Sequence, residues 1–203
     1  MLRQAKNKRC ISVLVAGVIG CALLLTIPLS YAENTQVYSN KEYRFSFKFP
    51  ASWHVQAPIT PNSKVKVVSP SSSLSAECAV IIKKVSQLDG QSQENLDQML
   101  LQSPPDKEQY QATLMQGFSD VSVIAVSQGR LGSRIAHMVR TRYSVRSKSS
   151  KEFVSMRMAK AFSPGMSWGL TCGGQGKSPD EAEKAYEYWQ TAINNIFMTF
   201  RFQ

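Results

Sequence analysis

The chain has 203 residues and a formal net charge of +10, from 24 Lys and Arg against 14 Asp and Glu. This length suits a single domain with a substantial core. No repeat or second domain is visible in the sequence, so solenoid, repeat and multidomain architectures are excluded.

Residues 1–32 have the pattern of a secretory signal peptide. Four basic residues lie between positions 3 and 9, an almost uninterrupted apolar run of 19 residues covers 11–29, and Ser30-Tyr31-Ala32 supplies small residues for cleavage before Glu33. The apolar run is also long enough for an uncleaved anchor, and residues 18–21, VIGC, resemble the lipobox of bacterial lipoproteins. The three interpretations stay open, and all predict export. We expect a periplasmic or secreted protein, or alternatively one anchored in the inner membrane and facing the periplasm.

Removal of the leader leaves 171 residues with a net charge of +6 and two cysteines, Cys78 and Cys172. In an exported protein, two cysteines predict one disulfide. Two buried thiols account for them equally well. If the bond forms, it closes a long loop and adds about 4–5 kcal/mol of stability in the chain-entropy model.

The most regular pattern is YRFSFKF at residues 43–49, where four aromatic residues alternate with three polar ones. Alternation predicts a strand with one aromatic face. Pro50 ends the strand because it cannot donate to a ladder, and Trp53 can fold back over its end. The polar residues 33–40 predict a flexible lead-in to a single domain at 41–203.

The rest of the chain predicts an α+β fold, in which an antiparallel β-sheet is flanked by helices. Short turns separate most of the later strands, so neighbouring strands run antiparallel. Ser178 and Glu181 form a capping box around Pro179 at the start of the last helix, which continues to Phe197. Strands are expected at 64–69, 77–85, 121–127, 133–146, 152–162 and 167–172, and two further helices at 94–102 and 106–118.

Two aromatic signatures are similar to those of the PsbP-like/DcrB-like superfamily. They are Y-x-F-x-F-x-F-P-x-x-W at residues 43–53 and I-x-x-I-F-x-T-F at 193–200, and the resemblance spans most of 38–202. It implies an α/β/α sandwich and a non-catalytic binding or accessory role. Photosynthetic members bind a membrane complex and hold metal ions, but no ligand cluster here matches theirs. We therefore expect no cofactor.

Two motifs point to catalysis or nucleotide binding, and both lack required parts. Residues 165–169 match G-x-S-x-G, which needs a strand, a sharp turn and a helix, with the histidine later in the chain. His54 and His137 both precede Ser167, so a small exported serine hydrolase using Ser167 is only the alternative function. Residues 172–178 resemble a phosphate loop without its first glycine, and we expect a flexible loop there.

The remaining candidates for a metal-binding or catalytic role are two isolated histidines and the acidic residues of the last helix. His54 and His137 lack the neighbouring ligands that a zinc site needs. The acidic side chains at the start of the last helix are expected to be solvated; they are Asp180, Glu181, Glu183 and Glu187.

Residues 130–160 carry nine basic residues and one acidic residue. Pairing Arg146 with Lys151 across a turn at 147–150 places Arg140 opposite Arg157, which is unfavourable unless water or an anion intervenes. The same pairing gathers five arginines on one face, namely Arg134, Arg140, Arg142, Arg146 and Arg157. One interpretation is a solvated edge hairpin. The other is a surface that binds anions.

The combined prediction is a non-catalytic exported binding or accessory protein of the bacterial cell envelope. It would contact an anionic partner through the basic hairpin at 130–160. Candidate partners are an envelope protein and an anionic lipid or lipopolysaccharide surface, with membrane contact through residues 11–29 if the leader is retained. Nucleic acid is not expected outside the cell.

Overall fold

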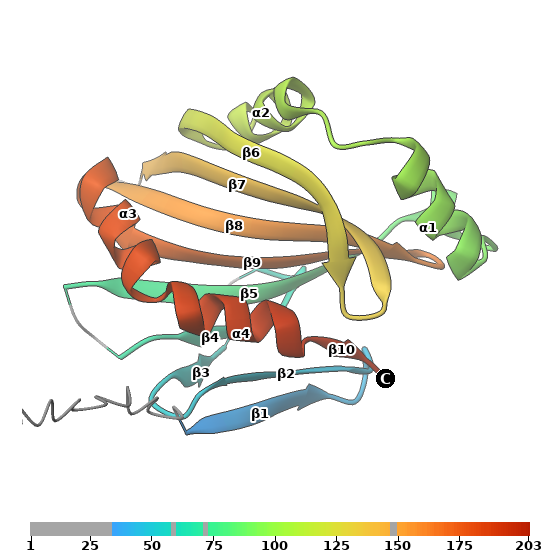
Figure 1. Cartoon of the computed structure of the whole chain (residues 1–203), viewed down its shortest axis with the longest axis horizontal. Coiled ribbons are helices and arrows are strands. Elements are labelled where there is room, and N and C mark those ends of the chain that lie inside the picture. Colours follow the sequence, from blue (N-terminus) through green and yellow to red (C-terminus); the bar gives the residue numbers. More distant parts are fainter. Residues whose placement is uncertain (1–33, 58–59, 71–72, 147–149) are drawn as a thin grey trace, which may run out of the picture. The chain divides into compact units, whose positions relative to one another are not determined.

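The computed structural model describes residues 34–57, 60–70, 73–146 and 150–203. All of them belong to one compact unit (Figure 1). The signal-peptide, anchor and lipobox interpretations of residues 1–32 lie outside the described residues. Among the residues that are described, no helix has both the length and the apolar character needed to cross a membrane.

The main layer is an antiparallel seven-stranded sheet with the order β3-β4-β5-β9-β8-β7-β6. Such a sheet confirms the predicted α+β class. Strands β6 and β9 are longer than predicted because they continue pairing past the polar and glycine residues at their ends. The bounds are β3 His54–Gln56, β4 Ser63–Val68, β5 Ser75–Lys84, β6 Ser119–Leu131, β7 Arg134–Arg146, β8 Lys151–Ser163 and β9 Met166–Gly176.

The basic hairpin is formed by β7 and β8 in the predicted register, with Arg146 opposite Lys151 and Arg140 opposite Arg157. It does not lie at the edge of the sheet. Strand β6 pairs with the other side of β7 and is itself the edge strand. The interpretation of a solvated edge hairpin is therefore wrong.

A second, three-stranded sheet has the order β1-β2-β10, formed by β1 Thr35–Asn40, β2 Phe45–Pro50 and β10 Arg201–Phe202. The prediction of a flexible lead-in is wrong, because residues 35–40 pair along the whole of β2. The side chains of β1 are mostly exposed, so this strand carries no apolar alternation that would reveal it. Strand β2 begins later than predicted, since Arg44 adopts a positive φ of 55° in the preceding turn.

The aromatic side chains of β2 form the centre of the core. Phe45, Phe47 and Phe49 are each at most 2% exposed. Phe200, at the end of the last helix, stacks on Phe45 and Phe47 with ring centroids 5.7 and 6.4 Å apart. The predicted aromatic face is confirmed, and the C-terminal helix covers it.

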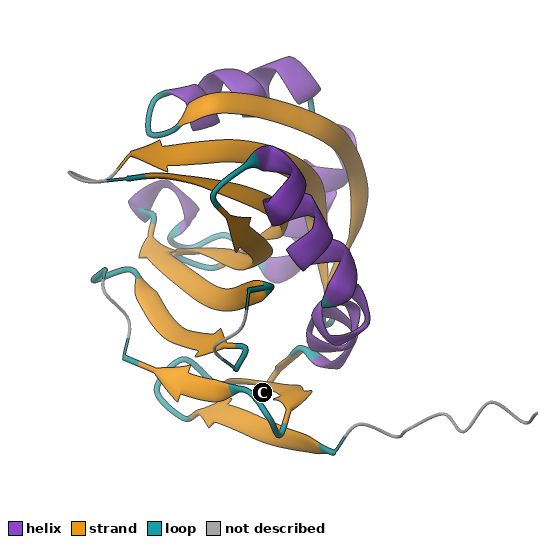
Figure 2. Ribbon diagram, turned by 90° about the vertical axis from the view of Figure 1, so that its left-hand side faces the viewer, coloured by secondary structure: helices purple, strands orange, loops and turns teal. Residues whose placement is uncertain are grey.

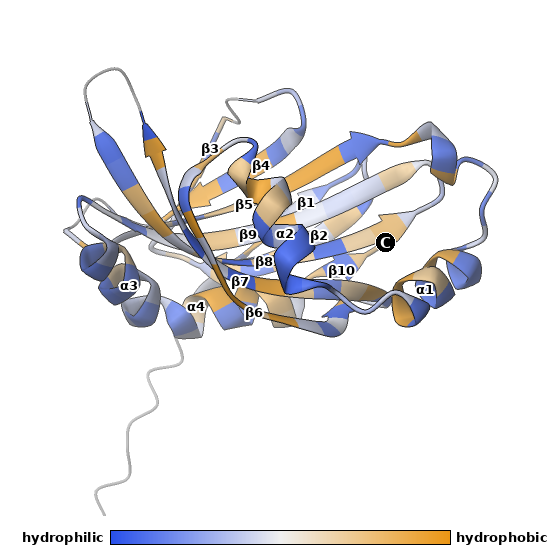
Figure 3. Cartoon of the chain, turned by 90° about the horizontal axis from the view of Figure 1, so that it is seen from above, coloured by the Kyte–Doolittle hydropathy of each residue, from blue (hydrophilic) through white to orange (hydrophobic). Residues whose placement is uncertain are grey.

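Helices lie on both faces of the seven-stranded sheet (Figure 2). Because side chains alternate along β7, Arg140 and His137 point to opposite faces; Arg140 contacts α3 and His137 contacts α1 and α2. In Figure 3, α4 alternates hydrophobic and hydrophilic segments, consistent with its one buried face. The helices are η1 Ser86–Leu88, α1 Gln93–Gln102, α2 Lys107–Met115, α3 Pro179–Tyr188 and α4 Gln190–Thr199.

The predicted single C-terminal helix is divided at Trp189. Its backbone leaves the helical region (φ −94°, ψ 6°), and its indole Nε1 donates a hydrogen bond of 2.7 Å to the carbonyl of Leu74. This contact holds Trp189 against the sheet side of the helix pair. Half of the predicted capping box forms, with Ser178 Oγ accepting from the Glu181 amide at 3.2 Å, whereas the Glu181 carboxylate accepts from the Lys177 amide at 2.8 Å.

The predicted flexible loop at 172–178 is wrong, because residues up to Gly176 belong to β9. Helix α3 lies directly on this strand. A Cβ atom on Gly174 would come within 2.2 Å of the Tyr186 amide nitrogen, and one on Gly176 within 2.6 Å of the Ala182 amide nitrogen. These glycines are therefore required for helix packing rather than for loop flexibility.

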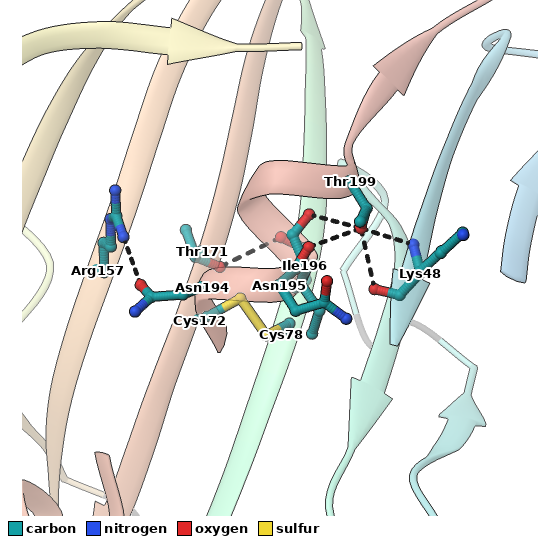
Figure 4. Close-up of a disulfide and its surroundings, with 10 residues drawn as sticks. Lys48, Cys78, Arg157, Thr171, Cys172, Asn194, Asn195, Ile196 and Thr199 are labelled. Atoms are coloured by element: carbon teal, nitrogen blue, oxygen red, sulfur yellow. Dashed lines mark hydrogen bonds between the residues drawn. A yellow bond between two sulfur atoms is a disulfide. The ribbon is translucent and has the colours of Figure 1, made fainter. Parts of the chain in front are cut away.

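Cys78 and Cys172 form a disulfide between directly paired residues of β5 and β9. The bond lies beside α4 (Figure 4), and both residues are 1% exposed. It excludes the two-thiol alternative. The linked residues are 94 positions apart in the chain, so loop closure contributes about 4–5 kcal/mol in the chain-entropy model.

Candidate functional site

A cleft of about 430 Å³ opens between the sheet and the C-terminal helices. We call it the arginine cleft, because Arg140 and Arg157 project into it from neighbouring strands. Strands β6, β7 and β8 form one wall, and α3 and α4 form the other. Its lining residues are Ala125, Val126, Ser127, Met138, Val139, Arg140, Arg157, Glu183, Tyr186, Glu187, Gln190 and Asn194.

Arg140 is held by four kinds of contact. Its Nη2 donates to both carboxylate oxygens of Glu183, at 3.0 and 2.9 Å, and to Ser155 Oγ at 2.8 Å. Its Nη1 donates to two backbone carbonyls of the sheet, and the guanidinium lies 3.7 Å from the ring centroid of Tyr186. Glu183 of α3 therefore supplies Arg140 with a counter-ion from within the protein.

Glu183 also accepts hydrogen bonds from Arg142 Nε at 3.0 Å and from Ser155 Oγ. Burial disfavours its ionisation, but the bonds from Arg142 and Ser155 and the charge of Arg140 outweigh burial and lower the Glu183 pKa to about 2. Glu183 is thus paired, and the expectation of a solvated side chain is wrong for it. Sequence reasoning missed its role, although a row of arginines on a covered face is a signal that a counter-ion must come from the covering element.

We expect Glu183→Gln to lower the free energy of unfolding by about 2 kcal/mol at pH 7, because it leaves Arg140 without its partner. Since the folded-state pKa lies below the ordinary value of 4.5, this contribution is complete above about pH 4.5 and is lost as pH falls towards 2. Urea unfolding at pH 7 and pH 3 measures it. The difference between variant and wild type should shrink by more than half at pH 3.

Glu187→Gln, an exposed position on the same helix, is the control and should leave unfolding within about 0.5 kcal/mol of wild type. An equal loss for both variants would contradict the assigned role of Glu183.

Arg157 is held differently from Arg140. Its Nη1 donates to Asn194 Oδ1 at 2.8 Å (Figure 4), and its guanidinium lies 4.6 Å from the ring centroid of Phe197. Among the described residues, no carboxylate forms an ion pair with it. Its Nε and second Nη atom also have no hydrogen-bonding partner in that part of the chain. Arg157 therefore presents an unneutralised, oriented cation in the cleft.

The remaining two predicted arginines lie apart from the cleft. The Arg134 guanidinium lies 3.5 Å from the ring centroid of Phe202, and burial lowers its pKa to about 10 while the charge of Asp97 opposes this shift. Its buried Nη1 has no hydrogen-bonding partner among the described residues. Arg146 is exposed at the end of β7. Register places all five arginines on one face, but only Arg140 and Arg142 contact Glu183, and Arg157 lines the same cleft without an ion pair among the described residues.

The geometry does not support catalysis by Ser167. This residue is the second of β9, directly after the Gly165 turn, so the strand–turn–helix of a nucleophile elbow is missing. His54 bonds to Gln56, and His137 bonds to Tyr110 and to the Leu100 carbonyl. Within the described ranges, no group of three or more His, Cys, Asp or Glu residues could hold a metal ion.

A scan against protein-family models found no match, and a search of curated proteins found none either. Among solved structures, the chain is similar to cyanobacterial PsbP (CyanoP) from Synechocystis sp. PCC 6803, with a TM-score of 0.52 and 12% identity over 92% of this chain and 100% of that one. It is also similar to LpqN, described as involved in cell envelope biogenesis of Mycobacterium tuberculosis (TM-score 0.44, 12% identity, 85% and 86% covered), and to the Saccharomyces cerevisiae Ran-binding protein Mog1p (0.48, 6%, 84% and 96%). Only the first score exceeds 0.5, and identities this low establish the fold alone. The similarity to CyanoP confirms the predicted resemblance at the level of architecture, and the chain has the PsbP-like/DcrB-like fold.

Proposed function

We propose that this protein is a non-catalytic accessory protein of the bacterial cell envelope that binds an acidic segment of a protein partner in the arginine cleft. Two features support export. One is the leader pattern of residues 1–32. The other is the buried Cys78–Cys172 disulfide, since disulfides persist in oxidising compartments.

The observation that carries the proposal is the state of Arg157. Its guanidinium is oriented by Asn194 and Phe197 and keeps donors that face the cleft. A planar guanidinium with free donors pairs well with a carboxylate, often through two parallel hydrogen bonds. Arg140 cannot do the same, because Glu183 already occupies it.

The shape of the site favours a protein segment over a membrane surface. The cation lies inside a cleft between a sheet and two helices, which a protruding side chain can enter and a flat layer of headgroups cannot. Beside the cleft, β6 ends the sheet and exposes Ala125 and Ser127. An extended peptide could run along this edge while one of its carboxylates reaches Arg157.

The test is a titration of the protein with a hexaglutamate peptide at low salt, followed by NMR. We expect chemical-shift changes at residues 125–127 and 157, an affinity that falls as salt rises, and about tenfold weaker binding for Arg157→Gln. Arg130→Gln, an exposed basic position outside the cleft, is the matched control and should bind like wild type.

Vesicles of phosphatidylglycerol serve as the second ligand. Binding to these vesicles, but not to the peptide, would replace the protein partner with a lipid surface. Equal peptide affinity for wild type and Arg157→Gln would remove the arginine cleft from the function.

A further inference from the structure

A second, smaller pocket lies on the other face of the seven-stranded sheet. Its volume is about 180 Å³, and it is enclosed by α1 and α2 on one side and by β7 and β8 on the other. An apolar cavity of about 150 Å³ is large enough for benzene. The pocket is therefore of a size to hold one small organic molecule.

His137 and Lys160 face this pocket from directly opposed positions of β7 and β8. His137 Nε2 lies 3.4 Å from the carbonyl oxygen of Leu100 and must donate to it, since a carbonyl only accepts. In the neutral imidazole, Nδ1 is then the acceptor for the Tyr110 hydroxyl at 3.1 Å. The hydroxyl proton of Tyr110 is thus directed to His137, and both groups are fixed as part of the wall.

Unlike His137 and Tyr110, which are hydrogen-bonded to each other, Lys160 has no counter-ion among the described residues. Its side chain is partly buried, and its Nζ lies 5.3 Å from the ring centroid of Phe162. Among the described residues, no carboxylate forms an ion pair with it. Burial lowers its pKa, and the nearby charge of Lys83 lowers it further. A partly buried ammonium without a counter-ion is a costly arrangement that an anionic ligand would relieve.

The rest of the wall restricts the ligand. Leu100, Phe162 and the ring of Tyr110 supply apolar surface, which favours a short aliphatic or aromatic body. Of the described residues that line the pocket, Lys160 is the one lysine or arginine, so a second negative charge on the ligand would remain unpaired.

We infer that this pocket binds a small monocarboxylic acid, whose carboxylate pairs with Lys160 and whose apolar body packs against Phe162 and Tyr110. The site is independent of the arginine cleft, which lies on the opposite face of the sheet. Failure of either proposal leaves the other unaffected.

Isothermal titration calorimetry with benzoate and its uncharged analogue benzamide tests the inference. Wild type should bind benzoate at least about tenfold more tightly than benzamide. Lys160→Gln should remove this preference while keeping the wild-type circular dichroism spectrum, and Lys160→Met replaces it if the glutamine variant folds poorly. Lys84→Gln, an exposed lysine of β5, should retain the full preference.

Three outcomes would overturn the inference. The first is no saturable binding of benzoate at millimolar concentrations. The second is an unchanged preference in Lys160→Gln. The third is loss of the preference in Arg157→Gln, which would place the carboxylate in the arginine cleft instead.

Discussion

Phe47→Lys is expected to leave the chain unfolded at 25 °C. Phe47 is 2% exposed, and its ring packs against those of Phe49 and Phe200, with centroids 5.9 and 6.4 Å away. The substitution removes a buried aromatic ring, which costs about 3–5 kcal/mol. It also places an unpaired ammonium in an apolar core. The sum is comparable to the whole stability of a domain of this size, about 5–15 kcal/mol.

Lys48→Ala is the matched control, because Lys48 is the next residue in β2 and its side chain is exposed on the opposite face of the strand. Thermal unfolding followed by circular dichroism should give a wild-type transition for this variant and no cooperative transition for Phe47→Lys. Similar melting temperatures for the two would show that the aromatic face of β2 does not form the core.

Gly174→Ala is expected to displace α3 from the sheet and to lower the free energy of unfolding by about 3 kcal/mol or more. The added Cβ would lie 2.2 Å from the Tyr186 nitrogen and 2.7 Å from the Ala182 oxygen. Both are backbone atoms of a helix and cannot rotate away. Because Glu183 belongs to the same helix, its bonds to Arg140 should be lost together with the packing.

Gly169→Ala provides the control in the same strand. It lies on the opposite face of β9, where a Cβ would meet Ile81 Cβ at 3.6 Å, an ordinary contact distance. Urea unfolding should show wild-type stability within about 0.5 kcal/mol for this variant. If Gly174→Ala is equally harmless, α3 does not depend on close contact with β9.

Patterns with a strong local cause were predictable from the sequence. Alternation of aromatic and polar residues located β2, and the expected pairing of Arg146 with Lys151 gave the observed register of β7 against β8. That register also implies that His137 lies opposite Lys160, so one side of the second pocket was available from the sequence. Its helical wall was not, because nothing local to Tyr110 indicates which strand α2 covers.

The misinterpreted segments share a physical cause. Residues 35–40 are mostly polar and mostly exposed, so their strand depends on the edge that β2 offers for pairing. Gly174 and Gly176 indicate a loop when only neighbours in the chain are considered, whereas their role depends on a helix that packs across them. Glu183 looks solvated for the same reason, since its arginine partners lie more than 40 residues earlier in the chain.

By itself the sequence determined most of the strand and helix types and the hairpin register, because these follow from side-chain periodicity and turn chemistry between near neighbours. Only the tertiary structure decided which charges are neutralised. Ion pairing depends on distances between segments remote in the chain, and the approach of α3 to β7 converted Arg140 into a structural residue. The same packing left Arg157 as the oriented cation of the cleft.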